Sequence, residues 1–369
     1  MSHSESESKA PRQQLTSREI SEVWDAAANF DDSLRIRSKQ INLIGSKRIL
    51  PAPYSRTQMF ESMLSSEPAL FSGFPIRHRF NQAGLSDVPH LVETIRSGLP
   101  RSKRARVRTK SVMEYLPVGR VLDRWERAKA VLGVTDLHYI GTRLDALVDT
   151  DYLNDFNLLE RGTDSFQSQD SLVISSEGAV TDSHSDDHSG SNHSFIGTKL
   201  WLLWDTLEGF DFGLEDVERC DVYERAAFEL SAFLAMRSSR WILIGPGQTM
   251  FIPAHLTHKV ITLKRYLGLG SFHAALPGFL NSLLRWTALP PLWTSKHSSN
   301  GSCSVEHITQ RAIRRIKYLR SGTEIKQIQW GVPYLRRRLQ SPDLNDQAIR
   351  AMIIENRLIQ NFVRAASLL

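Results

Sequence analysis

The 369-residue chain has little cysteine and no long apolar run. Its two cysteines, Cys220 and Cys303, lie far apart in the sequence, which excludes a disulfide framework and a cysteine-based zinc site. No stretch reaches the roughly 18 apolar residues of a membrane span, and the polar start does not resemble a secretory signal. We therefore expect a reducing compartment (cytoplasmic, nuclear or both), no membrane contact, and a disordered tail over residues 1–15.

Positive charge is present in excess, at +6, and is unevenly placed. Residues 101–110 carry six Lys and Arg and no acid, and residues 301–369 hold 12 Lys and Arg against 5 Asp and Glu. Such blocks bind nucleic acid or an acidic partner, or act as a nuclear localisation signal. Segments 101–110 and 311–338 are the candidate contacts, and a solvated face is the plainer alternative.

Hydrophobic residues make up 41% of the chain and charged residues 23%, which is a globular composition. Thr16 or Ser17 caps an expected helix, and a second helix is expected over 57–66. The centre contains short runs of strand formers separated by Gly and Pro, a pattern typical of a sandwich or barrel. The expected strands are 69–71, 171–175, 196–204, 241–244, 249–252, 259–263 and 267–272.

After residue 290 the pattern becomes helical. Apolar residues from Val305 to Leu319 recur every three or four positions, and Ser341-Pro342 marks another helix start. We predict a domain over 16–290, with its strand core at about 165–275, and a helical extension over 291–369. The apolar face of the extension packs on the core or on a second copy of the chain.

The pair His184 and Asp186 is the strongest chemical signal. Side chains two apart in an extended segment point the same way, so both can bind one ion. His258 follows a strand pair and can supply a third ligand. Two histidines and one carboxylate form the facial triad of non-haem iron(II) oxygenases. Asp187 is the carboxylate if the register shifts by one, and His188 and His193 have no assigned role.

The surroundings of this pair resemble the JmjC oxygenases, the cupin-type iron(II)- and 2-oxoglutarate-dependent family. The likeness covers roughly 65–275, and its residues follow the order and spacing of the family pattern. They are Glu67–Gly73, Thr181, His184, Asp186, Gly197-Thr-Lys199-Leu-Trp201, Pro246-Gly247, Pro253 and His258.

The resemblance implies a mainly β protein with flanking helices, in which a double-stranded β-helix (jelly-roll) core precedes the helical extension. His184, Asp186 and His258 would hold Fe(II), and dioxygen would be the oxidant. Lys199 would pair with the distal carboxylate of 2-oxoglutarate, helped by the Thr181 hydroxyl. Further co-substrate contacts are expected from Asn192, from Ser271 or His273, and from Tyr139, which is equally explained as a core tyrosine.

The resemblance also favours a protein or peptide substrate, hydroxylated or demethylated on a side chain, with succinate and CO2 as co-products. C-terminal helices form a homodimer in the protein-hydroxylase branch, and the same is expected here. Three alternatives stay open: the same chemistry on a small molecule, an inactive cupin-like binding module, and a nucleic-acid-binding protein whose histidines are incidental.

Overall fold

Two long antiparallel strands, β10 (Ser189–Asp205) and β13 (Leu256–His273), run through the centre of the computed structural model. The structure describes residues 14–78, 88–109, 112–127, 130–149, 152, 156–162, 169–217, 226–276, 278–291, 293–294, 305–321 and 330–369. The long strands belong to an 11-stranded mixed sheet in the order β1-β2-β12-β10-β13-β8-β6-β4-β5, with β11 paired to β10 and β9 paired to β13.

The remaining strands are short, and helices precede, interrupt and follow them. The strands are β1 (Ala52–Pro53), β2 (Ala69–Ser72), β3 (Arg77–His78), β4 (Arg104–Arg108), β5 (Met113–Pro117), β6 (Gly133–His138), β7 (Val148–Asp149), β8 (Gln169–Ser175), β9 (Val180–His184), β11 (Arg240–Ile244) and β12 (Gln248–Ile252). The helices are α1 (Ser17–Ala28), α2 (Ile41–Ser46), α3 (Arg56–Ser65), α4 (Val88–Gly98), α5 (Val118–Glu126), α6 (Thr206–Asp211), α7 (Leu230–Ala235), α8 (Phe279–Ala288), α10 (Val305–Ser321), α12 (Val332–Leu339), α13 (Gln347–Glu355) and α14 (Arg357–Ala366).

Each long strand changes partners near its middle. The first half of β10 pairs with β12 and its second half with β11, while β13 pairs with β9 at its start and with β8 at its end. The register between β10 and β13 shifts between Ser194 and Lys199. Gly197 lies in this shift with φ +83°, and a Cβ there would lie 2.0 Å from the Arg265 carbonyl oxygen. Only glycine allows so close a backbone approach.

The two halves of the sheet share one apolar cluster. Side chains of β2, β8 and β12 pack with those of β10, β11 and β13 from the other half; the buried members are Leu70, Val173, Trp201, Leu203, Ile242, Ile244, Met250, Ile252, Leu256, Val260 and Tyr266. Because residues of both halves meet in this cluster, we call their shared side the inner face. Alternation along a strand places the neighbouring side chains on the outer face.

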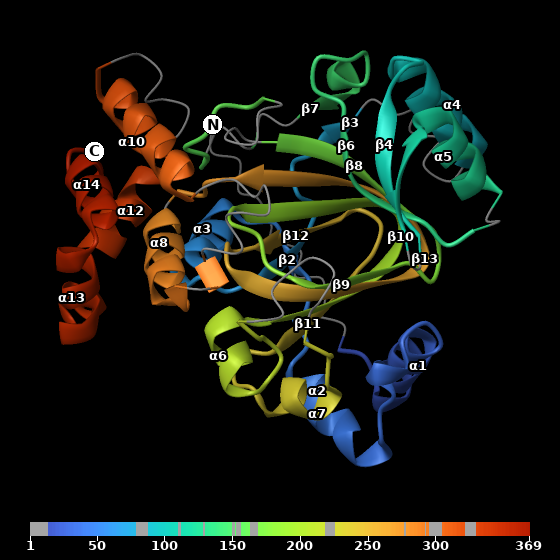
Figure 1. Ribbon diagram of the computed structural model, residues 1–369, viewed down its shortest axis with the longest axis horizontal. Helices are drawn as coiled ribbons and strands as arrows, with labels where there is room; N and C mark the ends of the chain where they lie inside the picture. The colour runs from blue at the N-terminus through green and yellow to red at the C-terminus, as the bar shows by residue number, and fades with distance from the viewer. Residues whose placement is uncertain are drawn as a thin grey trace, which may run out of the picture.

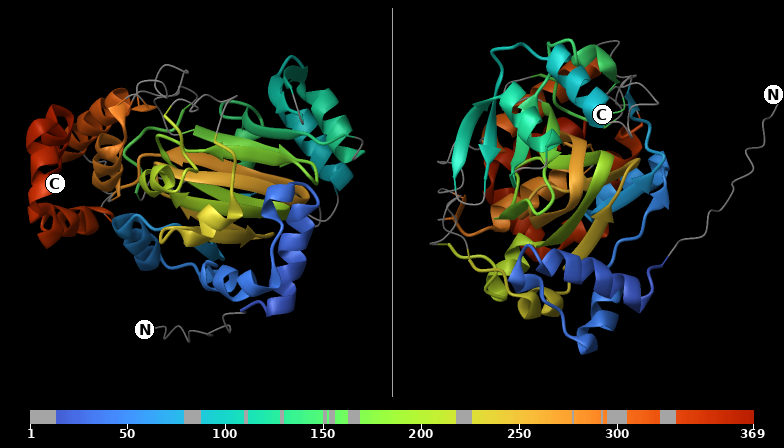
Figure 2. Two further views of the ribbon diagram at one scale, coloured as in Figure 1. Left: turned by 60° about the horizontal axis from the view of Figure 1, so that its bottom comes forward. Right: turned by 90° about the vertical axis from the view of Figure 1, so that its right-hand side faces the viewer.

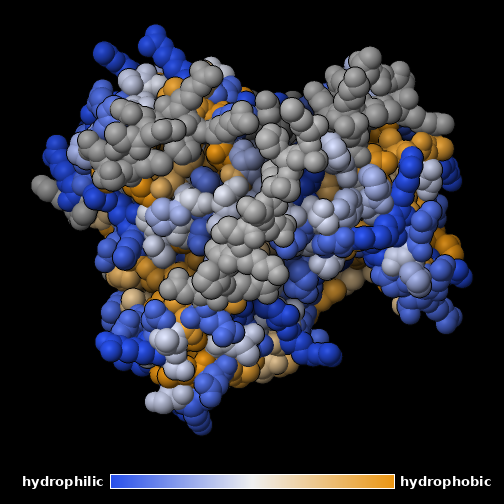
Figure 3. All heavy atoms as spheres, turned by 180° about the vertical axis from the view of Figure 1, so that it is seen from behind, coloured by the Kyte–Doolittle hydropathy of each residue, from blue (hydrophilic) through white to orange (hydrophobic). Residues whose placement is uncertain are grey.

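Helices surround the sheet in three groups (Figures 1 and 2). Leu200, Leu202 and Trp204 of β10 pack with α1, α2 and α7. Helices α4 and α5 lie against β4, β6 and β8. The C-terminal helices gather at the opposite end of the sheet. Seen from behind, hydrophilic side chains form much of the outline, with smaller hydrophobic patches between them (Figure 3).

Many local expectations are confirmed. Thr16 caps α1 through a capping box with Glu19, α3 matches the expected helix, and each expected strand lies within an observed one. Val305, Ile308, Ala312 and Ile316 are buried on α10, and α10 packs against α14 of the same chain. The side chain of Leu319, and residues 1–13 of the expected tail, lie outside the described residues.

Two expectations need correction. The stretches 259–263 and 267–272 form one strand, because Lys264–Tyr266 continue the extended backbone between them. The fold is mixed α/β rather than mainly β, with helices before, beside and after the large sheet. Helical turns in 88–127 pack on the sheet through Leu91, Ile95 and Trp125, and the sequence analysis had not assigned them.

Candidate metal centre

His184, Asp186 and His258 come together at one end of β9 and β13. His184 ends β9 and lies directly opposite His258 in the pairing with β13, and Asp186 follows in the next loop. One ligand atom from each lies within 4.8 Å of the other two; His258 Nε2 is 3.7 Å from Asp186 Oδ2. A metal–ligand distance of about 2 Å puts two ligands of one ion up to roughly 4 Å apart. The set therefore fits one ion after small side-chain rotations.

Both imidazoles are oriented by the backbone. The Nδ1 atom of His184 is 2.8 Å from the Asp182 carbonyl oxygen, and that of His258 is 3.2 Å from the Leu256 carbonyl oxygen. A carbonyl accepts only from a protonated nitrogen, so this contact fixes the proton on Nδ1 and leaves Nε2 with its lone pair. Metal-binding histidines are commonly held in this way. In their neutral form the two imidazoles therefore offer Nε2 to an ion, beside the carboxylate of Asp186.

An irregularity in β9 brings Thr181 to the same face. His184 pairs with His258 and Thr181 pairs with Val260, with a register shift between them. His258 and Val260 are two apart on β13 and point the same way. Two residues of β9 thus oppose one of β13, as in a β-bulge, and Thr181 shares the face of His184.

The neighbouring acids and histidines occupy different places. Asp187 is buried and its Oδ1 lies 4.0 Å from Nδ1 of His255, whereas Asp186 lies at the two histidines. The ring of His188 lies 5.9 Å from that of Phe272. His193 is buried with its Nδ1 2.7 Å from Thr249 Oγ1. The geometry therefore favours Asp186 over Asp187 as the third ligand.

Lys199 lies on the inner face, four residues before Leu203, which pairs with His258. Its backbone is therefore about 13 Å from that position along the strand. Only 3% of the residue is exposed, and burial lowers the pKa of its ammonium to about 7. No carboxylate forms an ion pair with Lys199 in the part of the chain that the structure describes. A buried cation is costly without an anion, so this position suits an anionic ligand.

Tyr266 and Asn192 lie beside this lysine. The Lys199 Nζ is 4.4 Å from the centre of the Tyr266 ring, and the Tyr266 hydroxyl donates a hydrogen bond to Asn192 Oδ1. Burial raises the pKa of Tyr266, so the hydroxyl keeps its proton. Asn192 is thus brought close to Lys199, and Tyr266 is a further polar neighbour that the sequence analysis missed.

Ser271 and Tyr139 lie elsewhere. Asn192 pairs with Gly270, so Ser271 points to the opposite face, where its Oγ is 3.4 Å from the Tyr152 hydroxyl. His273 lies on that face too, stacked on Phe251. Tyr139 is fully buried in the cluster beneath α4 and α5. The structure does not bring Ser271, His273 or Tyr139 to Lys199.

Three further residues border the metal centre. The Trp201 ring lies 5.2 Å from that of His258. On β6, desolvation raises the pKa of Asp136, a hydrogen bond with Thr135 and the charge of His138 partly offset this, and the charge of Asp186 raises it further. The polar alternation of Thr135-Asp-Leu-His138 was the sequence signal for this strand, and only Tyr139 was considered there.

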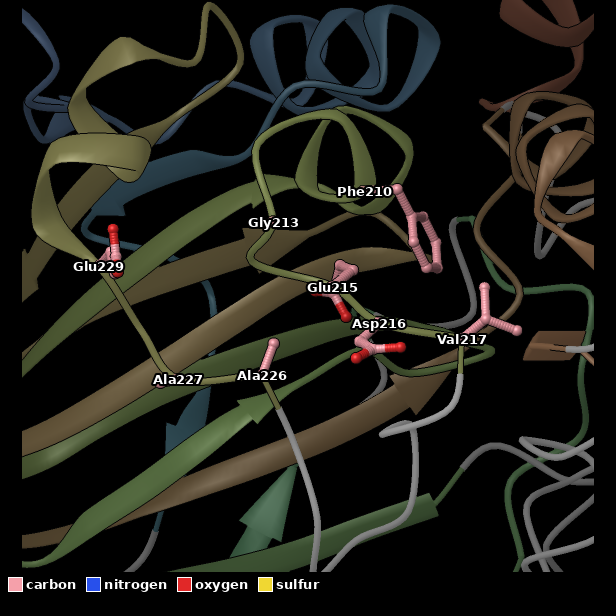
Figure 4. Close-up of a pocket in the computed structure, with 8 residues that line it drawn as sticks. All are labelled: Phe210, Gly213, Glu215, Asp216, Val217, Ala226, Ala227 and Glu229. Carbon is pink, nitrogen blue, oxygen red and sulfur yellow. The ribbon is translucent and has the colours of Figure 1, made fainter.

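A separate hollow lies on the connection between α6 and α7 (Figure 4). Phe210, Gly213, Val217, Ala226 and Ala227 line it together with three acids, of which Glu215 and Asp216 lie next to each other and Glu229 lies apart. None of these residues belongs to the histidine cluster. Within the described ranges, no helix is long and apolar enough to cross a membrane.

Comparison with known proteins adds no assignment. A scan against models of protein families finds no match, and a search of curated proteins finds no significant relative.

Proposed function

We propose that this protein is an iron(II)- and 2-oxoglutarate-dependent oxygenase of the JmjC type. The observation that carries the proposal is the convergence of His184, Asp186 and His258, whose ligand atoms lie within 4.8 Å of one another. Two histidines and one carboxylate leave other coordination positions of an octahedral ion open, as an oxygenase requires. Fully closed structural sites instead use four protein ligands.

The path of the chain supports a jelly-roll core. β10 and β13 each contribute to two groups of strands, and both groups contribute side chains to one inner cluster. Two antiparallel sheets formed by shared long strands and packed face to face are typical of a double-stranded β-helix. In this interpretation the metal centre lies at one end of the sandwich, between β9 and β13.

Each residue then has a defined task. His184 and His258 would hold the iron through Nε2, because their Nδ1 protons are donated to backbone carbonyls, and Asp186 would add the anionic ligand. Bound iron(II), with 2-oxoglutarate and dioxygen, supplies oxidation of an unactivated C–H bond with succinate and CO2 as co-products. Lys199 would bind the distal carboxylate in a charge-assisted contact.

The apolar neighbours keep water away from this contact. Trp201 and Val260 are buried between the positions of Lys199 and His258 on the inner face, and Leu203 is buried opposite His258. A low local dielectric strengthens the attraction between the ammonium and a carboxylate. Thr181, opposite Val260, can donate its hydroxyl from the neighbouring strand.

Succinate production tests the proposal. Protein loaded with iron(II) without oxygen is exposed to air with 2-oxoglutarate, and succinate is measured beside His258→Ala prepared in the same way. We expect succinate from the wild type only, even without a prime substrate, together with a 2-oxoglutarate-dependent absorption band of the iron. Absence of both signals from the wild type would refute the oxygenase. The expected protein substrate stays a prediction. Mass spectrometry of peptide and metabolite pools, each incubated with the enzyme, would show which pool contains the oxidised substrate.

A further inference from the structure

The basic segment 101–110 forms a strand whose arginines share one face. In β4, Ala105 and Val107 are buried against α4 and α5, and the alternating residues Arg104, Arg106 and Arg108 therefore point away from those helices. Arg104 and Arg106 are exposed. Figure 1 shows the two helices on one side of β4. A run that could have been merely solvated is thus an ordered row of cations about 6–7 Å apart.

An exposed tyrosine lies in the middle of this row. Tyr115 of β5 pairs directly with Arg106, so its side chain shares the arginine face. It is 64% exposed, which is unusual for a large aromatic residue on a rigid sheet. The Arg104 guanidinium donates to the Tyr115 carbonyl oxygen, which ties the two strands together at this point. We call Arg104, Arg106, Arg108 and Tyr115 the hairpin face.

Several other arginines of the molecule are paired with acids, unlike Arg104 and Arg106. On α5, Arg124 contacts Glu114, and in the C-terminal basic segment Arg315, Arg337 and Arg338 contact Glu160, Glu61 and Asp343. Among the described residues, no carboxylate lies within ion-pair distance of Arg104 or Arg106. These two cations are available to an external anion.

The hairpin face also lies beside the metal centre. The Arg108 guanidinium is 3.6 Å from the Asp182 carboxylate, and the Asp182 carbonyl accepts the hydrogen bond that orients His184. A ligand on the hairpin face would therefore lie close to the cluster of His184, Asp186 and His258.

We propose that the hairpin face binds single-stranded nucleic acid, with phosphates on Arg104 and Arg106 and a base stacked on Tyr115. An acidic peptide also matches a row of arginines, but it has no use for an exposed aromatic ring. Bases stack on such rings, and a basic surface with an aromatic platform is the usual single-strand site. A duplex buries its bases within its own stack and cannot use Tyr115 in this way.

Binding of a fluorescein-labelled 12-nucleotide RNA to the full chain, followed by anisotropy over a salt series, tests this. We expect the double variant Arg104→Gln/Arg106→Gln to weaken binding at least about ten-fold and to reduce the salt slope by about 1.4, at roughly 0.7 per lost phosphate contact. Tyr115→Ala should weaken binding about ten-fold with an unchanged slope, and Tyr115→Phe should restore it.

The matched control is Arg120→Gln/Arg127→Gln, which removes the same charge from an exposed position of α5 and from the exposed residue that follows it. It should bind within about two-fold of the wild type, because its only effect is on net charge. Equal losses of affinity from the two double variants would overturn the proposal. Equal affinity of the wild type for the same RNA annealed to its complement would also overturn it. Displacement of the RNA by poly-glutamate at equal charge concentration would assign the face to acidic proteins instead.

This inference is independent of the oxygenase. His184→Ala is expected to bind the RNA as the wild type does, since it removes a candidate metal ligand and leaves the hairpin face intact. A protein that binds RNA but forms no succinate would retain the hairpin face and refute only the proposed reaction.

Discussion

The two faces of β10 and β13 are built from the same strands but differ in chemistry. The outer face carries Leu200, Leu202, Trp204 and Ile261, all fully buried beneath N-terminal helices. The inner face contains Lys199 and His258 among Trp201, Leu203 and Val260. A purely apolar face needs no partner beyond its own helices. A buried ammonium and two convergent imidazoles lower the stability of the inner face unless ligands bind to them. The outer face is therefore suited to stabilising the fold, and the inner face to binding ligands.

Removing a proposed metal ligand tests the inner face most strongly. His258→Ala is expected to lose iron(II) binding by more than about 100-fold, because even partners that only orient a ligand contribute 10- to 100-fold. Iron content after anaerobic loading and gel filtration measures it. Asp187→Asn is the control and should retain iron, since its carboxylate faces His255. Iron lost from Asp187→Asn but retained by Asp186→Asn would reverse the assignment.

Removing an apolar side chain tests the outer face. Leu202→Ala is expected to lower the free energy of unfolding by about 2–5 kcal/mol, the range for buried leucines, because Leu202 is completely buried. Urea denaturation measures the change, and the folded fraction should still bind iron and 2-oxoglutarate. If the folded variant lost iron, the two faces would be coupled and the separation would fail.

The sequence predicted the local elements and the pairing of His184 with Asp186 for one physical reason: both depend on short-range spacing. The capping box at Thr16 and the His-x-Asp pair are complete within a few residues. The third candidate ligand, His258, could be proposed from its place after a strand pair, and the resemblance favoured the same residue. The structure then brought the three together.

Other features depend on register and could not be predicted. A shift of the strand register by one residue decides whether Ser271 or its neighbour Gly270 shares the face of Asn192. The bulge that aligns Thr181 with His184 has no marker in the residues 181–184 themselves. Tyr115 can be placed on the face of the arginines only from its pairing with Arg106. Long-range pairing, rather than composition, determines each of these positions.

Lys199 of the inner face should strengthen 2-oxoglutarate binding but lower the stability of the folded protein. Burial lowers the pKa of Lys199 to about 7, so the folded protein disfavours its charge relative to the unfolded chain. Lys199→Met is expected to raise the melting temperature by a few degrees and to weaken 2-oxoglutarate binding about 10- to 100-fold, the value of a charged hydrogen bond. Calorimetry measures both. A lower melting temperature with unchanged 2-oxoglutarate binding would make Lys199 a structural residue.

The smallest effect is a pH dependence in which binding and stability change in opposite directions. Above pH 7 the ligand-free Lys199 is largely neutral and must take up a proton to pair with a carboxylate, so affinity for 2-oxoglutarate should fall up to about ten-fold per pH unit. The unfolded chain keeps the proton up to the ordinary lysine pKa of 10.5. It therefore binds more protons than the folded chain between pH 7 and 10.5, and the Lys199 contribution to stability should rise with pH over that window.

Titration calorimetry and urea unfolding at several pH values measure the two trends, and both should be absent from Lys199→Met. If Lys199→Met showed the same loss of affinity with rising pH, a group other than Lys199 would take up the proton. Lys199 would then not be the residue that binds the anion on the inner face.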